Sequence, residues 1–105
     1  TARPTTATIR REFLERMIRA EIAGAFARHV ATRRAAEVFQ KLVIGPSEQS
    51  VTVLRASYAA GEVQLFDVVA EQRRFIDTQK AYTEAIRQEA LARVALERAV
   101  GSPLK

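Results

Sequence analysis

The chain has 105 residues, with 17 lysines and arginines against 12 aspartates and glutamates, and so a formal net charge of +5. That length suits one ordinary domain, and 48% apolar with 28% charged residues is typical of a folded helical chain rather than a disordered one. The absence of cysteine excludes disulfides and thiolate chemistry. No apolar run reaches the roughly 18 residues that a transmembrane helix needs.

The first half of the chain, residues 7–59, has a helical pattern. Pro4 indicates an irregular lead-in, and a threonine at position 5, 6 or 8 can cap the helix that follows. Apolar residues then recur every three to five positions along one drifting stripe: Ile9, Phe13, Met17, Ile22, Phe26, Val30, Ala35, Val38 and Leu42. Because proline lacks an N–H group and clashes with the preceding turn, Pro46 predicts a helix that is kinked or broken near 44–47.

The second half predicts another long helix, at about 63–100, joined to the first by a tip at 60–62. Gly61 stands between the two patterns, and glycine reaches positive φ without a steric penalty. Gly101, followed by serine and proline, is a typical helix stop. The predicted fold class is therefore all-α: one long antiparallel hairpin, coiled-coil-like, with its tip near 58–63.

The second helix offers more than one contact stripe. A 3-4 spacing links a first stripe that includes polar residues: Leu65, Val68, Gln72, Phe75, Gln79, Tyr82, Ile86, Glu89, Arg93, Leu96 and Val100. Beside it lie a second stripe (Val69, Ile76, Ala90) and a third of small residues (Ala81, Ala85, Ala92, Ala95, Ala99). A hairpin alone would leave much of this apolar surface wet, so we expect neighbours on both sides of the helix.

Basic residues are spread along the whole chain rather than clustered. Several have an acid one helical turn away, which stabilises exposed helix faces by about 0.2–0.5 kcal/mol per pair: Glu12–Arg16, Glu15–Arg19, Glu37–Lys41 and Glu89–Arg93. This pattern favours a solvated helical surface over a nucleic-acid site. The single histidine, His29, has no second histidine or cysteine with which to hold a metal. We expect it to be a surface or packing residue, and we expect no metal or cofactor.

Several motifs, taken in order, give the chain a family resemblance. They are Tyr58-x-x-Gly61, LFDVVAEQR at 65–73, AY at 81–82 and ALERAVG at 95–101, with EIAGAFAR at 21–28 and the interruption near Pro46 upstream. Over roughly residues 9–104 the chain resembles the C-terminal part of TolC-like outer-membrane efflux proteins, the heavy-metal efflux branch in particular. No signal peptide is visible, so if the protein is exported, we expect this chain to be a piece that has lost its leader.

The resemblance implies a non-catalytic transport component of the Gram-negative outer membrane. Proteins of this family are homotrimers with a membrane β-barrel and a long periplasmic α-helical barrel, and this chain matches one helical hairpin of that barrel. The hairpin tips meet a periplasmic adaptor and, through it, an inner-membrane pump. Separated from its neighbours, such a hairpin is expected to self-associate.

Five residues fall on site positions of the family. Ala60, Gly61 and Glu62 match the tip motif that contacts the adaptor, Tyr58 matches a tyrosine of the closed-gate network, and Asp67 matches an acid facing the pore. Two positions depart from the family pattern. Val63 stands where the best-known member has a basic residue, and Ala70 stands where a second acid often occurs, so only part of the gate carries over.

The residues themselves leave other interpretations open. Any hairpin needs a turn glycine such as Gly61, Tyr58 can be a packing residue, and Asp67 can be a helix-start acid near the positive end of the helix dipole. The whole chain can also be a cytosolic coiled-coil scaffold, or a nucleic-acid binder acting through dispersed arginines. The serines lack nearby histidine–acid partners and no phosphate-binding glycine loop occurs, so no enzymatic activity is expected.

Overall fold

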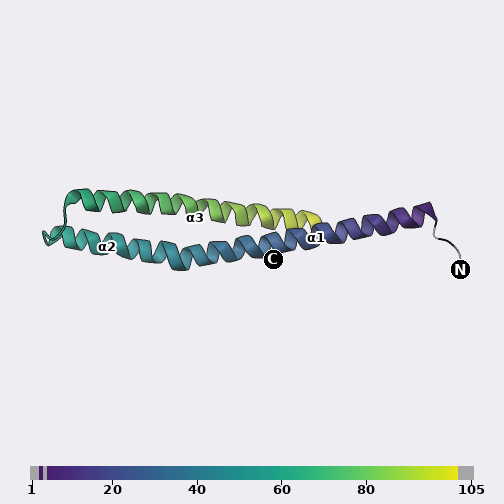
Figure 1. Ribbon diagram of the computed structural model, residues 1–105, viewed down its shortest axis with the longest axis horizontal. Helices are drawn as coiled ribbons and strands as arrows, with labels where there is room; N and C mark the ends of the chain where they lie inside the picture. The colour runs from purple at the N-terminus through teal and green to yellow at the C-terminus, as the bar shows by residue number, and fades with distance from the viewer. Residues whose placement is uncertain (1–2, 4, 102–105) are drawn as a thin grey trace.

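The computed structural model, which describes residues 3 and 5–101, is one long helical hairpin (Figure 1). Its elements in chain order are α1 (Thr6–Phe39), the π-helical turn η1 (Gln40–Ile44), α2 (Gly45–Ala59) and α3 (Leu65–Val100). The first three form one continuous rod, and α3 returns alongside it in the opposite direction. The predicted all-α hairpin is confirmed, and α3 begins two residues later than the sequence pattern suggested.

The hairpin is a rod rather than a globule. Its principal extents are 87 × 22 × 17 Å, and its radius of gyration is 23.9 Å. A compact domain of this length would have a radius of gyration of about 13 Å. Only five described residues are buried, and all are apolar: Ala25, Val51, Val68, Ala92 and Leu96. Two helices side by side cannot enclose an interior, so the core is a single thin seam.

The helix ends follow from local sequence. Thr5 is the N-cap of α1, since its Oγ1 accepts a hydrogen bond from the Thr8 N–H at 3.1 Å. At the far end of α3, Gly101 has a φ of 77° and its N–H donates to the Glu97 carbonyl at 2.9 Å. This is the left-handed C-cap that a glycine permits. The serine and proline of the predicted stop signal lie outside the described residues.

The expected irregularity near Pro46 is present, and it takes the form of a π turn rather than a break. Residues on both sides of the turn keep right-handed helical backbone angles, and the Gly45 N–H donates to the carbonyl of Gln40, five residues back. Pro46 then occupies the first turn of α2. The wider turn lets the rod continue past a residue that lacks an N–H group and whose ring would crowd the turn before it.

The π turn also keeps the helix contact in register. Contact positions along α1 and into η1 alternate by three and four residues up to Val43. Two successive steps of four then lead through Ser47 to Val51 on α2. One extra residue has therefore entered the repeat. A π turn holds that extra residue without rotating the rest of the rod away from α3.

The seam of α3 repeats strictly every seven residues. One row is Val68, Phe75, Tyr82, Glu89 and Leu96, and the second is Glu71, Thr78, Ala85, Ala92 and Ala99, all of them buried or half-buried. The first row consists of alternate members of the first predicted stripe. The second row includes three alanines of the predicted small-residue stripe, Ala85, Ala92 and Ala99. Tyr82 stacks on Phe39 of α1 with ring centroids 5.9 Å apart. Such a repeat is typical of coiled-coil packing.

The predicted apolar stripe of the first helix faces outward along most of its length. Phe26, Val30, Val38 and Leu42 are all exposed, and α3 is contacted instead by smaller and more polar residues such as Ala25, Thr32 and Ala36. The most apolar face of α1 is therefore left without a partner. Burial of that face would require another helix.

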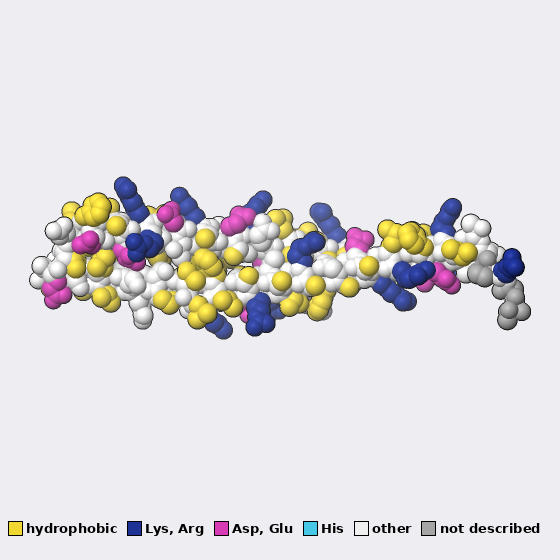
Figure 2. Space-filling view, in the orientation of Figure 1, with side chains coloured by type: hydrophobic (Ala, Val, Ile, Leu, Met, Phe, Trp, Pro, Cys, Tyr) yellow, Lys and Arg dark blue, Asp and Glu magenta, His cyan; other side chains and the backbone are white. Residues whose placement is uncertain are grey.

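The beginning of α1 continues past the end of α3 (Figure 1). Every residue from 6 to 18 is exposed, and this overhang carries a group of large apolar side chains: Ile9, Phe13, Leu14, Met17 and Ile18. Figure 2 shows apolar side chains along the whole visible face of the rod, with lysines and arginines projecting between them. Large apolar patches of this kind mark interaction surfaces in soluble proteins.

Candidate functional site

The tip is closed by a Schellman motif, a hydrogen-bonded ending of α2 that requires a residue with positive φ. The Glu62 N–H donates to the Ser57 carbonyl at 2.9 Å, and the Gly61 N–H donates to the Tyr58 carbonyl at 3.0 Å. Gly61 has a φ of 77°, which explains why glycine stands here. A Cβ at this position would meet no other atom within 4 Å, so the constraint is the backbone angle and not space.

The first turn of α3 is fixed by Asp67. Its Oδ2 accepts a hydrogen bond from the Gln64 N–H at 3.3 Å, and its own N–H donates to the Gln64 carbonyl at 3.0 Å. This is the position from which an acidic side chain satisfies a free N–H at the start of a helix and interacts with the positive end of its dipole. Asp67 therefore has a local structural role whatever else it does.

All the predicted site residues lie at the tip and reach solvent. Ala60, Gly61 and Glu62 form the exposed turn, and the Tyr58 side chain lies at the end of α2 with the residue 45% exposed. Within the described chain, no hydrogen bond joins Tyr58 to Asp67. The tip thus groups these residues in space without connecting the two predicted gate residues to each other.

Two large apolar residues that are exposed at the tip were not among the predicted site residues. Phe66 is 78% exposed and Leu65 is 55% exposed, both in the first turn of α3. Their position at the start of the second helical pattern, a few residues after the turn glycine, was a visible signal. An aromatic and an aliphatic side chain beside an exposed turn give the tip an apolar contact surface, and such residues are enriched in protein interfaces.

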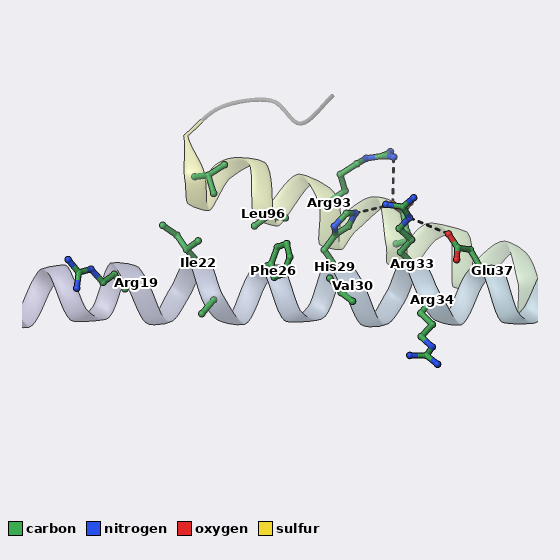
Figure 3. Close-up of a pocket in the computed structure, with 13 residues that line it drawn as sticks. Arg19, Ile22, Phe26, His29, Val30, Arg33, Arg34, Glu37, Arg93 and Leu96 are labelled. Atoms are coloured by element: carbon green, nitrogen blue, oxygen red, sulfur yellow. Dashed lines mark hydrogen bonds and ion pairs between the residues drawn. The ribbon is translucent and has the colours of Figure 1, made fainter.

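A second feature is a groove along one flank of the hairpin, near the open end of α3 (Figure 3). We call it the basic groove, and its volume is about 1340 Å³. Its floor is apolar: Ile22, Phe26 and Val30 from α1, and Leu96 and Val100 from α3. Its charged residues are four arginines (Arg19, Arg33, Arg34, Arg93) and two glutamates (Glu37, Glu89), with His29.

Both glutamates of the basic groove are already paired. Glu89 lies 3.4 Å from His29 Nε2 across the two helices and 3.7 Å from Arg93 Nη1 on its own helix, and Arg33 Nε donates to Glu37 at 3.3 Å. Figure 3 shows His29, Arg33 and Glu37 on the side of α1 that faces α3, with Arg93 above them. The side chains of His29 and Glu89 are only 14% and 17% exposed, so this contact belongs to the helix interface.

The sequence pattern located His29 as a packing or surface residue but did not predict its partner. Glu89 follows the seven-residue row of the α3 seam, and that polar residue in a contact row was the available signal. Of the four predicted pairs one turn apart, Glu89–Arg93 forms, while Glu37 pairs with Arg33 instead of Lys41. Arg16 donates to the backbone carbonyl of Glu12 rather than to its carboxylate.

Three further features would point to a function: a metal site, a membrane-spanning helix and a similarity to a known protein. Among the described residues there is no group of three or more histidines, cysteines or acids placed to hold a metal ion. No helix of the described part is long and apolar enough to cross a membrane. No family model, no curated protein and no solved structure matches this chain.

Proposed function

We propose that this chain is a non-catalytic segment of a TolC-like outer-membrane efflux channel. In this proposal the hairpin forms part of the periplasmic conduit wall of a homotrimer. Ala60, Gly61 and Glu62 at the tip dock a periplasmic adaptor and, through it, an inner-membrane pump. Tyr58 and Asp67 lie where the conduit narrows, and three copies of Asp67 would form a negative ring that favours cations.

The observation that carries this proposal is the incomplete surface of the rod. Large apolar side chains are exposed on both helices, for example Phe26 at 57%, Leu42 at 70% and Ile76 at 48%. A two-helix rod with apolar residues on its outer faces is suited to a wall in which each helix has neighbours on two sides. The exposed faces alone do not say which kind of wall this is. The motifs that resemble TolC-like efflux proteins, including the motif at the tip, are the reason that we propose the wall of an efflux channel.

The tip variants test the docking role most directly. In a Gram-negative host whose own channel gene is deleted, the full-length parent protein with Glu62→Arg is expected to lose most of its efflux. A photo-reactive residue at position 62 should cross-link to a periplasmic adaptor identified by mass spectrometry. Asp77→Arg, the same charge reversal at an exposed position of α3, is the matched control and should keep efflux. Unchanged efflux with Glu62→Arg and with Gly61→Pro would contradict the docking role.

A coiled-coil interaction module in the cytosol is the second candidate, and the strict seven-residue repeat of α3 favours it. Cell fractionation separates the two proposals, because the channel segment belongs in the outer-membrane fraction and the scaffold in the cytosol. A salt titration of the chain against random DNA duplex tests the nucleic-acid alternative. The channel proposal expects no binding that falls steeply with salt.

A further inference from the structure

We propose that the basic groove binds an acidic amphipathic α-helix. This goes beyond the channel proposal, which says only that the flanks of the hairpin have neighbours, and it depends on the groove residues alone. The occupant is defined by its chemistry: one apolar face, and glutamates or aspartates along the edges of that face.

The shape of the groove favours a helix over a small ligand. On α1 the groove runs from Arg19 to Glu37, which is about 27 Å at the helical rise of 1.5 Å per residue. Its volume of about 1340 Å³ is larger than a typical small-molecule site, and it is open along its length. A groove between two antiparallel helices is the site into which a third amphipathic helix packs.

The floor provides apolar anchors at helical spacing. Phe26 and Val30 are 57% and 48% exposed and are one turn apart on α1. On α3, Val100 is 41% exposed and Leu96 beside it is buried, and both line the groove. An apolar face at the usual helical spacing can cover these side chains and remove them from water.

The charges select an acidic occupant. Glu37 is paired with Arg33, and Glu89 is paired with His29 and Arg93. The four arginines exceed the two glutamates by two positive charges, and one of the four, Arg34, lies at the outer edge of the groove with its side chain directed away from α3 (Figure 3). Carboxylates on the edges of a docked helix would meet this excess, and Arg is well suited to bind them with two hydrogen bonds.

The same charges argue against a second copy of the chain as the occupant. The most apolar exposed stretch that a second copy could insert is the overhang at residues 6–18, which has three arginines and two glutamates. The whole chain carries a net charge of +5. Like charges on groove and occupant would oppose docking.

The test uses the whole chain and two stapled 18-residue helical peptides. Both carry leucines on one face, and the remaining positions are glutamate in one peptide and lysine in the other. We expect the Leu/Glu peptide to bind in fluorescence anisotropy, more weakly as salt rises, and the Leu/Lys peptide not to bind. Arg33→Glu and Phe26→Ser should each weaken binding about tenfold or more. Because Arg33 and Phe26 are exposed, both variants should fold, and circular dichroism checks this.

Matched controls lie on other faces of the hairpin. Arg87→Glu and Leu91→Ser change exposed residues of α3 outside the groove, and binding should stay within about twofold. Equal binding of the two peptides, no binding at all, or an equal loss with Arg87→Glu would overturn the proposal. So would loss of self-association with Phe26→Ser, which would place a second copy in the groove, or Phe26-dependent binding to anionic phospholipid vesicles in place of the peptide.

Discussion

The tip and the basic groove are stabilised in different ways. At the tip, backbone hydrogen bonds join residues within five positions of one another, from Ser57 to Asp67. In the groove, His29 and Glu89 come together from positions sixty residues apart, on two different helices. The tip is thus determined locally, whereas the groove exists only while α1 and α3 keep their register. A change in the groove should therefore leave the tip intact, whereas a change that opens the tip should also disturb the groove.

The largest expected effect is on the groove end of the seam. Leu96 is 4% exposed, and Leu96→Ala should lower the free energy of unfolding by about 2–3 kcal/mol because it leaves a gap between α1 and α3. Leu91→Ala removes the same atoms from a residue that is 52% exposed and should cost less than about 0.5 kcal/mol. Urea unfolding followed by circular dichroism, at one fixed protein concentration, compares them. Equal losses would show that the seam is not where the hairpin is stabilised.

The next effect is on the tip. Gly61→Val should cost about 1–2 kcal/mol, because a β-branched residue is strained at positive φ. Gly101→Val is the matched control, since Gly101 has the same φ of 77° and equally open space. We expect it to cost less, because the last turn of α3 can unwind alone, whereas Gly61 holds two helices together. A larger loss of thermal stability with Gly101→Val than with Gly61→Val would mean that the tip does not hold the two helices together.

A smaller effect is expected where α3 begins. Asp67→Ala removes the acceptor of the Gln64 N–H and a negative charge near the helix start, which together should cost about 1 kcal/mol. Asp77→Ala, in the exposed middle of α3, should be nearly neutral. Hydrogen exchange of the amides in the first turn of α3 gives the local readout. Similar exchange rates in both variants would assign Asp67 no capping role.

The smallest expected effect concerns an outer face. Gly24 is exposed within α1, and a Cβ there would meet nothing within 4 Å. Gly24→Ala should therefore stabilise the isolated chain by about 0.8–1 kcal/mol through helix propensity. In the channel proposed above, loss of assembly with this variant would place a neighbouring helix against that face. A stabilised chain with unimpaired assembly would show that the face stays free.

The local features of the hairpin could be predicted from the sequence, and its contacts could not. Thr5, Gly61 and Gly101 act through their own backbone geometry, so their positions fixed the helix ends to within two residues. The face of α1 that packs against α3 was harder to predict. The large apolar residues of α1 lie mainly on its outer side, while Ala25 and Ala36 face α3. Hydrophobic periodicity finds an apolar stripe but does not say which neighbour covers it.

The basic groove shows the same limit. His29 and Arg33 lie on α1 and Glu89 and Arg93 lie on α3, and only the register of the two helices brings them together. That register depends on the length of the turn and on the extra residue held by the π turn. Neither quantity follows from the charge pattern of one helix. Within α1 itself, Glu37 was expected to pair with Lys41 and pairs instead with Arg33, four residues in the other direction.

The central claim is that the exposed apolar faces of this hairpin pack against further helices. Sedimentation equilibrium of the isolated chain over a wide range of concentrations tests it most directly. We expect concentration-dependent association that is weakened by Phe13→Ser on the overhang and retained with Phe26→Ser in the basic groove. A monomer at every concentration would contradict the claim.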